Sequence, residues 1–592
     1  MRKIVLKSLL AAVLAVTVST TACNKGDPNA LETHVENLGD AEKRGDAIKQ
    51  LERIVSGIAT DPNDVDRRNK FAEVVVPKLA EIYDADDVAP YRDQILDMAL
   101  KMKRPEAVVI WSKAVAVESS SGIDGSAEGQ KRAIMALQGI RDANATAAAG
   151  DVITAFKTLM EKPSKDMASG QEGVLRFEMA KTLGALKSKE AVDPLLAALA
   201  APETEQPKGI YKAAIDALGQ IGDPKAVDAL ITVQFSVADA PGTQSIGERA
   251  IRALGAIGAP AVPKLVETME GKNEAVNKLA AQNDVDVQLV QQLAVKILGV
   301  VGSSDAAPSI IAYMPQRDCG GDTVVDPKTL EDFDVAMAGN LRAFAANSLG
   351  FIGDPSAIEP LCKCRNATHN PGDLWEITAG LGRIGDKEGK AFECLQKIVT
   401  DNYYSFESDE DEDAAAKAAK EEFKYEIRWQ GIRYLILAAP HDKTAEIKAA
   451  IDGNDAKVKA EVEKLGWATG IAVLEECKDD KGCYEKIMSD STKPWFDREL
   501  AAFNFARRSE PGDIESAAKL AKAFKTRDPE ARIHIAWLTA KVAAGKPCPA
   551  CAAALEDVMK AEELTKEPTM QGAWLTARQS ISKLTGGSGG GE

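Results

Sequence analysis

A repeated pair of glycine motifs is the feature that most constrains how this chain can fold. Six segments carry an Ala-rich stretch with helical spacing that ends in Leu-Gly, with Ile-Gly or a close variant three residues further on and a second amphipathic stretch after it. The Leu-Gly glycines are Gly184, Gly219, Gly255, Gly299, Gly350 and Gly382. Their spacings of 35, 36, 44, 51 and 32 residues are typical of helix-pair repeats. The sequence therefore predicts an all-α fold, an α-solenoid of stacked antiparallel helix pairs with loop insertions.

The segment 214–231 shows how one repeat is expected to fold. Its apolar residues recur at helical spacing, at Leu218, Ile221, Val227, Leu230 and Ile231. Gly222 suits a helix end that needs a positive φ, Asp223 can cap the next helix, and Pro224 fits its first turn. One helix pair cannot cover its own apolar face, so stacking on neighbouring pairs must stabilise it.

The motif Leu-Gly-x-Ile-Gly-Asp-Pro resembles HEAT repeats, in particular the short subtype found in phycobilisome-lyase-like proteins. The resemblance covers about residues 174–400. Most members of that family are scaffolds and a few are bilin lyases, so the resemblance implies a fold and does not specify a function. A further HEAT-like class, the di-iron deoxyhypusine hydroxylases, is recognised by His-Glu pairs. The four histidines, His34, His369, His441 and His534, do not supply that pattern, so no metal or other cofactor is expected.

The amino terminus has the pattern of a bacterial export signal. Basic residues accompany an apolar stretch over 4–18, which is shorter than the ~20 residues of a membrane-spanning helix. The sequence predicts a signal peptide over residues 1–22 and, after it, a short linker to a lipid anchor over 23–30.

The segment Thr20-Thr21-Ala22-Cys23-Asn24 resembles a lipobox. The resemblance implies that Cys23 receives a diacylglyceryl thioether and becomes the first residue of the mature protein. Thr20 departs from the pattern, which usually has Leu at that position, so cleavage after Ala22 by an ordinary signal peptidase is the alternative. Asn24 differs from the Asp that the pattern associates with inner-membrane retention, which favours a periplasm-facing lipoprotein of the outer membrane.

The charge of the chain limits its partners. The formal net charge is −17, and non-specific nucleic-acid binding is excluded because a phosphate backbone requires a basic footprint. Anionic lipid surfaces repel such a chain, so membrane attachment is expected only through a lipid anchor. The acidity favours envelope proteins with a basic surface as partners.

The chain is expected to divide into segments around the repeats. The predicted segments are an N-terminal helical capping region (31–150), the HEAT-like repeat array (151–400), an acidic insertion (401–420), degenerate C-terminal helical repeats (421–580) and a flexible Gly-rich tail (581–592). Within the array, an extension near 271–287 and a loop near 315–336 account for the two long spacings.

The acidic insertion is a candidate contact for a cation or a basic partner. Its carboxylates are Glu407, Asp409, Glu410, Asp411, Glu412 and Asp413. The ligand spacing and central glycine of an EF-hand loop are missing from this run. Because the carboxylates repel one another, a solvated, mobile loop is the default interpretation.

Eight cysteines remain after Cys23, which allows four disulfides in an oxidising compartment. The pairs Cys477–Cys483 and Cys548–Cys551 are predicted because they are close in the sequence. For the remaining four, either Cys362 or Cys364 is expected to pair with Cys394, and the other with Cys319.

The Cys548-Pro549-Ala550-Cys551 motif is the strongest candidate for a catalytic site. A helix N-terminus lowers a thiol pKa, and this spacing is that of thiol-disulfide oxidoreductases. Such sites follow a β-strand, whereas the segments on both sides of this motif are predicted to be helical. This favours a structural disulfide.

The sequence thus predicts an exported, lipid-anchored HEAT-repeat scaffold that mediates protein–protein interaction in the bacterial envelope through its concave face, and not an enzyme. The alternatives are an envelope thiol-disulfide oxidoreductase that uses Cys548 and Cys551, and a module that binds cations or small molecules at the acidic insertion.

Overall fold

The computed structural model describes residues 31–585, apart from gaps at 62, 103, 123–125, 162–170, 203–205, 238–244, 315–332, 367–370, 386–387, 401–413 and 565–567. These described residues form helices joined by turns, without a strand among them, which confirms the all-α prediction. Within the same ranges, no helix has the length and apolarity needed to cross a membrane. The chain divides into two compact units, Met1–Ala114 and Val115–Glu592.

The first unit is a small helical bundle. Its helices are α1 (Leu31–Leu38), α2 (Arg44–Ala59), α3 (Val65–Val74), α4 (Val76–Ile82) and α5 (Arg92–Met102). Helix α2 packs against α1 and α5, and the buried side chains between them include Leu51, Val55 and Leu96. Helix α6 (Val108–Gly122) carries the chain into the second unit.

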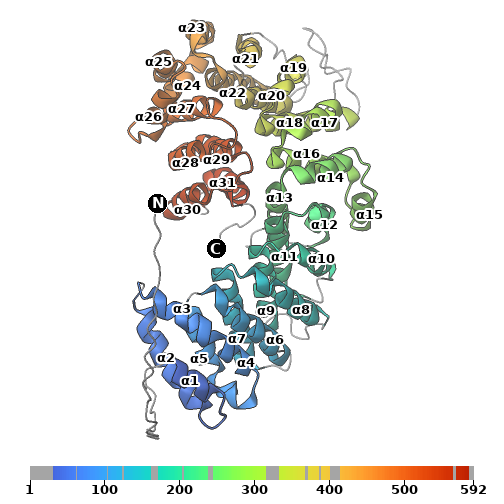
Figure 1. The fold of residues 1–592 in the computed structure, drawn as a ribbon. Helices are drawn as coiled ribbons and strands as arrows, with labels where there is room; N and C mark the ends of the chain where they lie inside the picture. Colours follow the sequence, from blue (N-terminus) through green and yellow to red (C-terminus); the bar gives the residue numbers. More distant parts are fainter. Residues whose placement is uncertain are drawn as a thin grey trace, which may run out of the picture. The chain divides into compact units, whose positions relative to one another are not determined.

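In the second unit the helices alternate between two layers (Figure 1). The first layer contains α7 (Ala127–Asp142), α9 (Gln171–Ala185), α11 (Lys208–Ile221), α13 (Ile246–Ile257), α16 (Val287–Val301), α18 (Phe333–Ile352), α20 (Pro371–Ile384) and α22 (Ala414–Ala438). The second layer contains α8 (Ala149–Met160), α10 (Val192–Ala200), α12 (Val227–Ser236), α14 (Val262–Met269), α17 (Ala307–Tyr313), α19 (Ile358–Lys363), α21 (Lys390–Thr400) and α23 (Thr444–Asp452). Successive helices of the first layer pack on one another, which confirms the predicted α-solenoid.

The turn between the two helices of a repeat has the chemistry that the sequence predicts. Gly222 ends α11 with φ 75° and donates its N–H to the carbonyl of Leu218. The Asp223 side chain accepts the N–H of Lys225 at 2.9 Å, and Pro224 begins a short 3-10 turn that leads into α12. The apolar residues named above for this repeat are buried.

The glycine of a Leu-Gly pair has a different role, which at Gly184, Gly219, Gly299 and Gly350 is to let the backbones of neighbouring first-layer helices approach closely. A Cβ atom on Gly219 would lie 2.8 Å from the Cα of Ala253 in α13, and one on Gly299 would lie 2.7 Å from the Cα of Ser348 in α18. Ordinary carbon–carbon contacts are about 3.5–4.0 Å. The Leu-Gly motif is therefore a helix-packing motif, and the Ile-Gly motif is a turn motif.

Two helices that precede the motif-bearing repeats pack on them in the same two layers. Helices α7 and α8 form a further repeat, in which Asn144 takes the positive-φ position with φ 47°. Arg141 holds this repeat to α9 through an ion pair with Glu178 at 2.7 Å. This repeat belongs to the second compact unit, which begins at Val115. The expected extension near 271–287 contains a helix, α15 (Glu274–Gln282), which packs on α12.

The C-terminal part continues the two layers and curves back on the array. Its helices are α24 (Ala456–Leu465), α25 (Trp467–Cys477), α26 (Lys481–Ser489), α27 (Trp495–Arg507), α28 (Ile514–Ala523), α29 (Pro529–Ala543), α30 (Pro549–Ala561) and α31 (Gln571–Leu584). Helices α27, α29 and α31 extend the first layer, and α26, α28 and α30 extend the second. Helix α31 packs against α13, so the first layer closes on itself (Figure 1).

Candidate functional site

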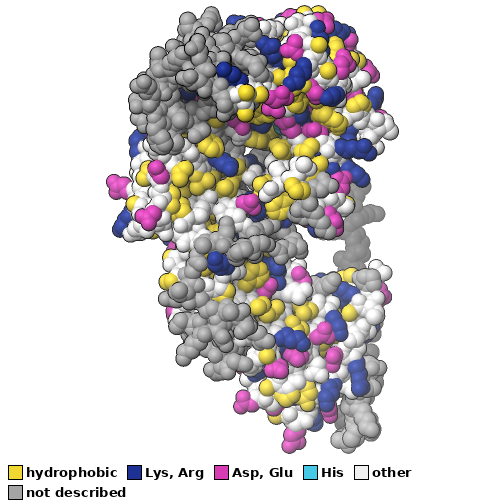
Figure 2. Space-filling model, turned by 180° about the vertical axis from the view of Figure 1, so that it is seen from behind, with side chains coloured by type: hydrophobic (Ala, Val, Ile, Leu, Met, Phe, Trp, Pro, Cys, Tyr) yellow, Lys and Arg dark blue, Asp and Glu magenta, His cyan; other side chains and the backbone are white. Residues whose placement is uncertain are grey.

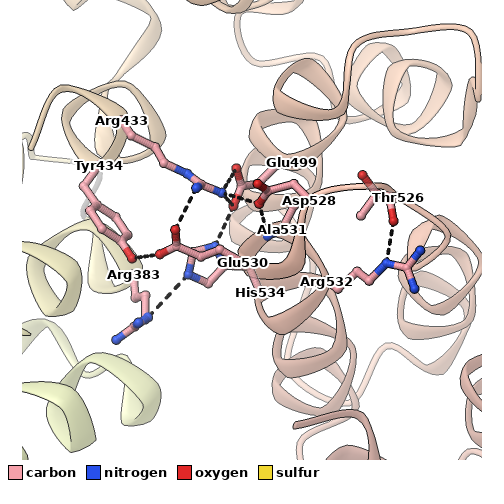
Figure 3. A network of polar contacts seen from close by, with 10 residues as sticks. All are labelled: Arg383, Arg433, Tyr434, Glu499, Thr526, Asp528, Glu530, Ala531, Arg532 and His534. Atoms are coloured by element: carbon pink, nitrogen blue, oxygen red, sulfur yellow. Dashed lines mark hydrogen bonds and ion pairs between the residues drawn. The ribbon is translucent and has the colours of Figure 1, made fainter. Parts of the chain in front are cut away.

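A cluster of charged side chains lies where the array meets the C-terminal helices. Arg383 comes from α20, Arg433 from α22, Glu499 from α27, and Glu530 and His534 from α29 (Figure 3). Buried charges are stable only when they are paired and hydrogen-bonded. Most polar atoms of this cluster have partners, but Nε of Arg433 and Nη1 of Arg383 have no hydrogen-bond partner among the described residues.

Arg433 is the centre of the cluster. Its guanidinium lies 2.8 Å from Glu499, 2.6 Å from Glu530 and 3.0 Å from Asp528, and its side chain is 3% exposed. Burial alone would lower the pKa of Arg433, but the carboxylates, led by Glu499, outweigh it and raise that pKa above its usual value. Burial alone would raise the pKa of Glu530, but Arg433 lowers it to about 2. Both groups are therefore charged.

His534 joins the cluster to the array in one defined tautomer. Its Nδ1 lies 2.6 Å from Glu499, and its Nε2 lies 3.4 Å from the Nε–H of Arg383. Because the arginine can only donate, Nε2 accepts and Nδ1–H donates to the carboxylate. Tyr434 donates its hydroxyl to Glu530, and burial, with the Glu530 charge, raises its pKa well above the usual value.

The cluster contains an acid, a base and an imidazole, but its environment suits it to holding helices together. His534 and Glu499 are both 0% exposed, so a substrate has no access to them. Arg532, nearby on α29, donates to the carbonyl of Thr526 and thus fixes the turn that leads into that helix (Figure 3). The cluster therefore joins four helices through buried ion pairs and hydrogen bonds. The sequence analysis missed it, although charges within the otherwise apolar stretch 496–506 were a usable signal.

A second set of contacts joins the C-terminal helices to the repeat turns. Trp537 of α29 donates its indole N–H to the carbonyl of Phe351 at 2.7 Å, and Lys541 of α29 donates to the carbonyl of Gly353 at 3.3 Å. Arg507 of α27 donates to the carbonyl of Gly382 at 3.3 Å. Cations and donors stabilise the last carbonyls of a helix. The chain itself therefore covers part of the first-layer face that a partner was expected to use.

The structure contains disulfides at the predicted cysteines. Cys362 in α19 pairs with Cys394 in α21, with a Cα–Cα distance of 5.8 Å, and so links neighbouring repeats. Cys477 pairs with Cys483 at 5.3 Å across the turn between α25 and α26. Cys364 is also disulfide-bonded. Cys319, the predicted member of the fourth pair, lies outside the described residues.

The Cys548–Cys551 disulfide is in a structural position. The Cα atoms are 5.3 Å apart, and Cys548 caps α30 by accepting the N–H of Cys551 at 3.2 Å. The two residues are 1% and 0% exposed. Thiol–disulfide exchange requires access of an attacking thiolate to a sulfur, which this burial opposes.

Two predicted sites cannot be placed. Cys23 and the acidic run from Glu407 to Asp413 lie outside the described residues. Among the residues that are described, no group of three or more His, Cys, Asp or Glu is arranged to hold a metal ion.

Comparison with known proteins identifies the repeats. The family models for HEAT repeats and for the PBS lyase HEAT-like repeat match residues 164–234 and 341–366, respectively. No curated protein was found to be similar in sequence.

Solved structures give distant similarities that concern the fold alone. A Kap121p mutant is 13% identical with a TM-score of 0.35, and the match covers 94% of this chain and 63% of that one. Uso1-2 is 10% identical with a TM-score of 0.31, over 98% and 100% of the two chains. Human deoxyhypusine hydroxylase is 18% identical with a TM-score of 0.18, over 55% and 99%. This chain thus spans less than two thirds of the length of the Kap121p mutant.

Proposed function

We propose that this HEAT-repeat solenoid is an exported, lipid-anchored scaffold of the bacterial envelope that binds other proteins through its helical array. The observation that carries the binding role is the stacked array itself, because HEAT-type solenoids present long continuous helical surfaces. Figure 2 shows basic, acidic and apolar side chains intermixed over the described part of one face, a composition that protein interfaces share with the rest of a protein surface.

Export is supported by two independent features. The amino-terminal segment has the order of an export signal followed by Cys23, and the folded part contains several disulfides. Disulfides persist in oxidising compartments and are rare in the cytosol.

The partner is identified by cross-linking in living cells, with thiols trapped, followed by capture of the tagged full chain and mass spectrometry. We expect a reproducible set of envelope proteins that a parallel Cys551→Ala strain leaves unchanged. Mixed disulfides through Cys548 that accumulate in that strain would instead establish thiol-disulfide chemistry.

The anchor is tested separately by labelling cells with a radioactive or clickable fatty acid. We expect labelled protein in the outer-membrane fraction, and unlabelled protein in the soluble periplasmic fraction after Cys23→Ala. Equal labelling of the two forms, or retention of the wild-type chain in the cytoplasm, would refute lipidation or export.

A further inference from the structure

The C-terminal helix α31 shows how a helix docks on the first layer. It lies against α13, where a Cβ on Gly255 would be 3.8 Å from Cε of Lys583, and Arg252, one turn before Gly255, is 6% exposed. Arg252 is six residues before Gly258, the positive-φ residue that ends α13. This position therefore marks the face of a first-layer helix that a docked helix covers.

The same face is open on α7 and α9. Gln138 in α7 and Lys181 in α9 have the position that Arg252 has in α13. Each lies six residues before a positive-φ residue, Asn144 and Lys187, respectively. Both are exposed, Lys181 with 45% of its side chain accessible, so among the described residues nothing covers this part of the layer as α31 covers α13.

An apolar groove lies on this open face. It has a volume of about 230 Å³. Its lining residues are Ala127, Gln130, Lys131, Ile134, Met135, Gln138 and Val174. Val174 is 51% exposed, whereas a valine in the array core is normally buried, and Ile134 and Met135 are half-buried. A groove of this kind accepts an apolar side chain of a partner helix.

The charge at the groove selects the partner. Lys131 is the charged member of the described lining, and Lys181 lies one helix away on the same face. The nearest described carboxylate to Lys181 is Glu178, at 3.9 Å, and Arg141 holds that carboxylate at 2.7 Å. Lys131 and Lys181 are thus two exposed cations on this face, in a chain whose net charge is −17.

We propose that the exposed face of α7 and α9 is the docking surface of the scaffold, and that its occupant is an acidic amphipathic helix of a partner protein. An apolar side chain of that helix fills the groove beside Val174, and its carboxylates lie on Lys131 and Lys181. The helix docks on α7 and α9 as α31 docks on α13, and so extends an interface that the chain already contains. This inference rests on the proposed scaffold function and names its surface and its partner chemistry.

The test uses the purified full chain and three synthetic helical peptides, measured by fluorescence anisotropy. One peptide has an apolar stripe flanked by Glu, the second has Lys in place of Glu, and the third keeps Glu but has Ser in the stripe. We expect binding of the first peptide alone, weakened about tenfold or more by Val174→Asp. Lys131→Glu combined with Lys181→Glu is expected to reverse the preference toward the Lys peptide.

Leu289→Asp is the matched control. Leu289 has the same position in α16 that Val174 has in α9, thirteen residues before the positive-φ residue, and it is 56% exposed. Both side chains are exposed, so both variants should fold, which circular dichroism checks. Equal weakening by the two substitutions, a preference of the wild-type chain for the Lys peptide, or binding of none of the peptides would overturn the proposal.

A cellular arm separates the failure of this surface from the failure of the scaffold function. A photoreactive amino acid is placed at position 174 or at position 289 of the full chain. We expect cross-links to a partner from position 174 and not from 289. If whole-chain cross-linking captures partners but position 174 captures none, the surface is wrong and the scaffold function stands; if neither captures any, the scaffold function itself fails.

Discussion

Replacing Gly219 by Ala tests whether the Leu-Gly motif exists to let helices approach. The new Cβ would lie 2.8 Å from both Cα and Cβ of Ala253, so α11 and α13 must separate by about 1 Å to reach ordinary contact distances. Overpacking of this kind costs about 1–3 kcal/mol. Alanine also stabilises a helix by up to about 1 kcal/mol relative to glycine, which offsets part of this cost. We therefore expect a net loss of about 1–2 kcal/mol in the free energy of local unfolding.

Gly150→Ala is the control for this experiment. Gly150 is exposed in the first turn of α8, and a Cβ there meets no other atom within 4 Å, so helix propensity alone should act and stabilise α8 slightly. Hydrogen exchange of the full chain reports both effects. We expect the amides of α11 and α13 to exchange about 5- to 30-fold faster in Gly219→Ala and at an unchanged rate in Gly150→Ala. If the two variants were equally stable, the close-approach explanation of the motif would be refuted.

The charged cluster and the disulfides give further predictions. Arg433→Met leaves the fully buried Glu499 without its cation and should lower the free energy of unfolding by about 3–5 kcal/mol in urea denaturation. Adding Glu499→Gln should restore part of that free energy. No loss in the single variant would contradict the stabilising role of the cluster. Arg433 lowers the pKa of Glu530 to about 2, so the contribution of Glu530 to stability is present above about pH 4.5 and is lost as the pH falls toward 2. Glu530→Gln should therefore make the free energy of unfolding depend less on pH in this acidic range. An unchanged pH dependence would argue against the pairing of Glu530 with Arg433. Cys362→Ser with Cys394→Ser removes a link between residues 32 apart and should cost about 2–4 kcal/mol in the oxidised protein, with no difference from the wild-type chain under reducing conditions.

The sequence was sufficient to predict the repeats because their turn chemistry is local. Gly222, Asp223 and Pro224 act within a few residues of one another, and their roles in the structure are those that the pattern predicts. The repeat α7–α8 was not found, because Asn144 replaces the turn glycine and Arg141 uses an ion pair where other repeats use a close glycine contact.

The charged cluster could not be predicted because its geometry depends on the return of the C-terminal helices to the array. Arg433 is 66 residues from Glu499 and 97 from Glu530, and no periodicity relates these positions. The same return covers part of the face that the sequence analysis left open for a partner. The groove beside Lys131 was missed for a related reason, since a total charge carries no information on how charges are distributed over one face.

Closure of the first layer by α31 on α13 also limits how the length of this chain can change in evolution. An open solenoid can gain or lose a helix pair anywhere, because each pair contacts only its neighbours. Between α13 and α31, a lost pair would shift Lys541 and Trp537 away from the turns at Gly353 and Phe351 and break the contact that closes the layer. Duplication and deletion of repeats are thus compatible with the fold on the amino-terminal side of α13, whereas the number of repeats in the closed part is fixed by its circumference.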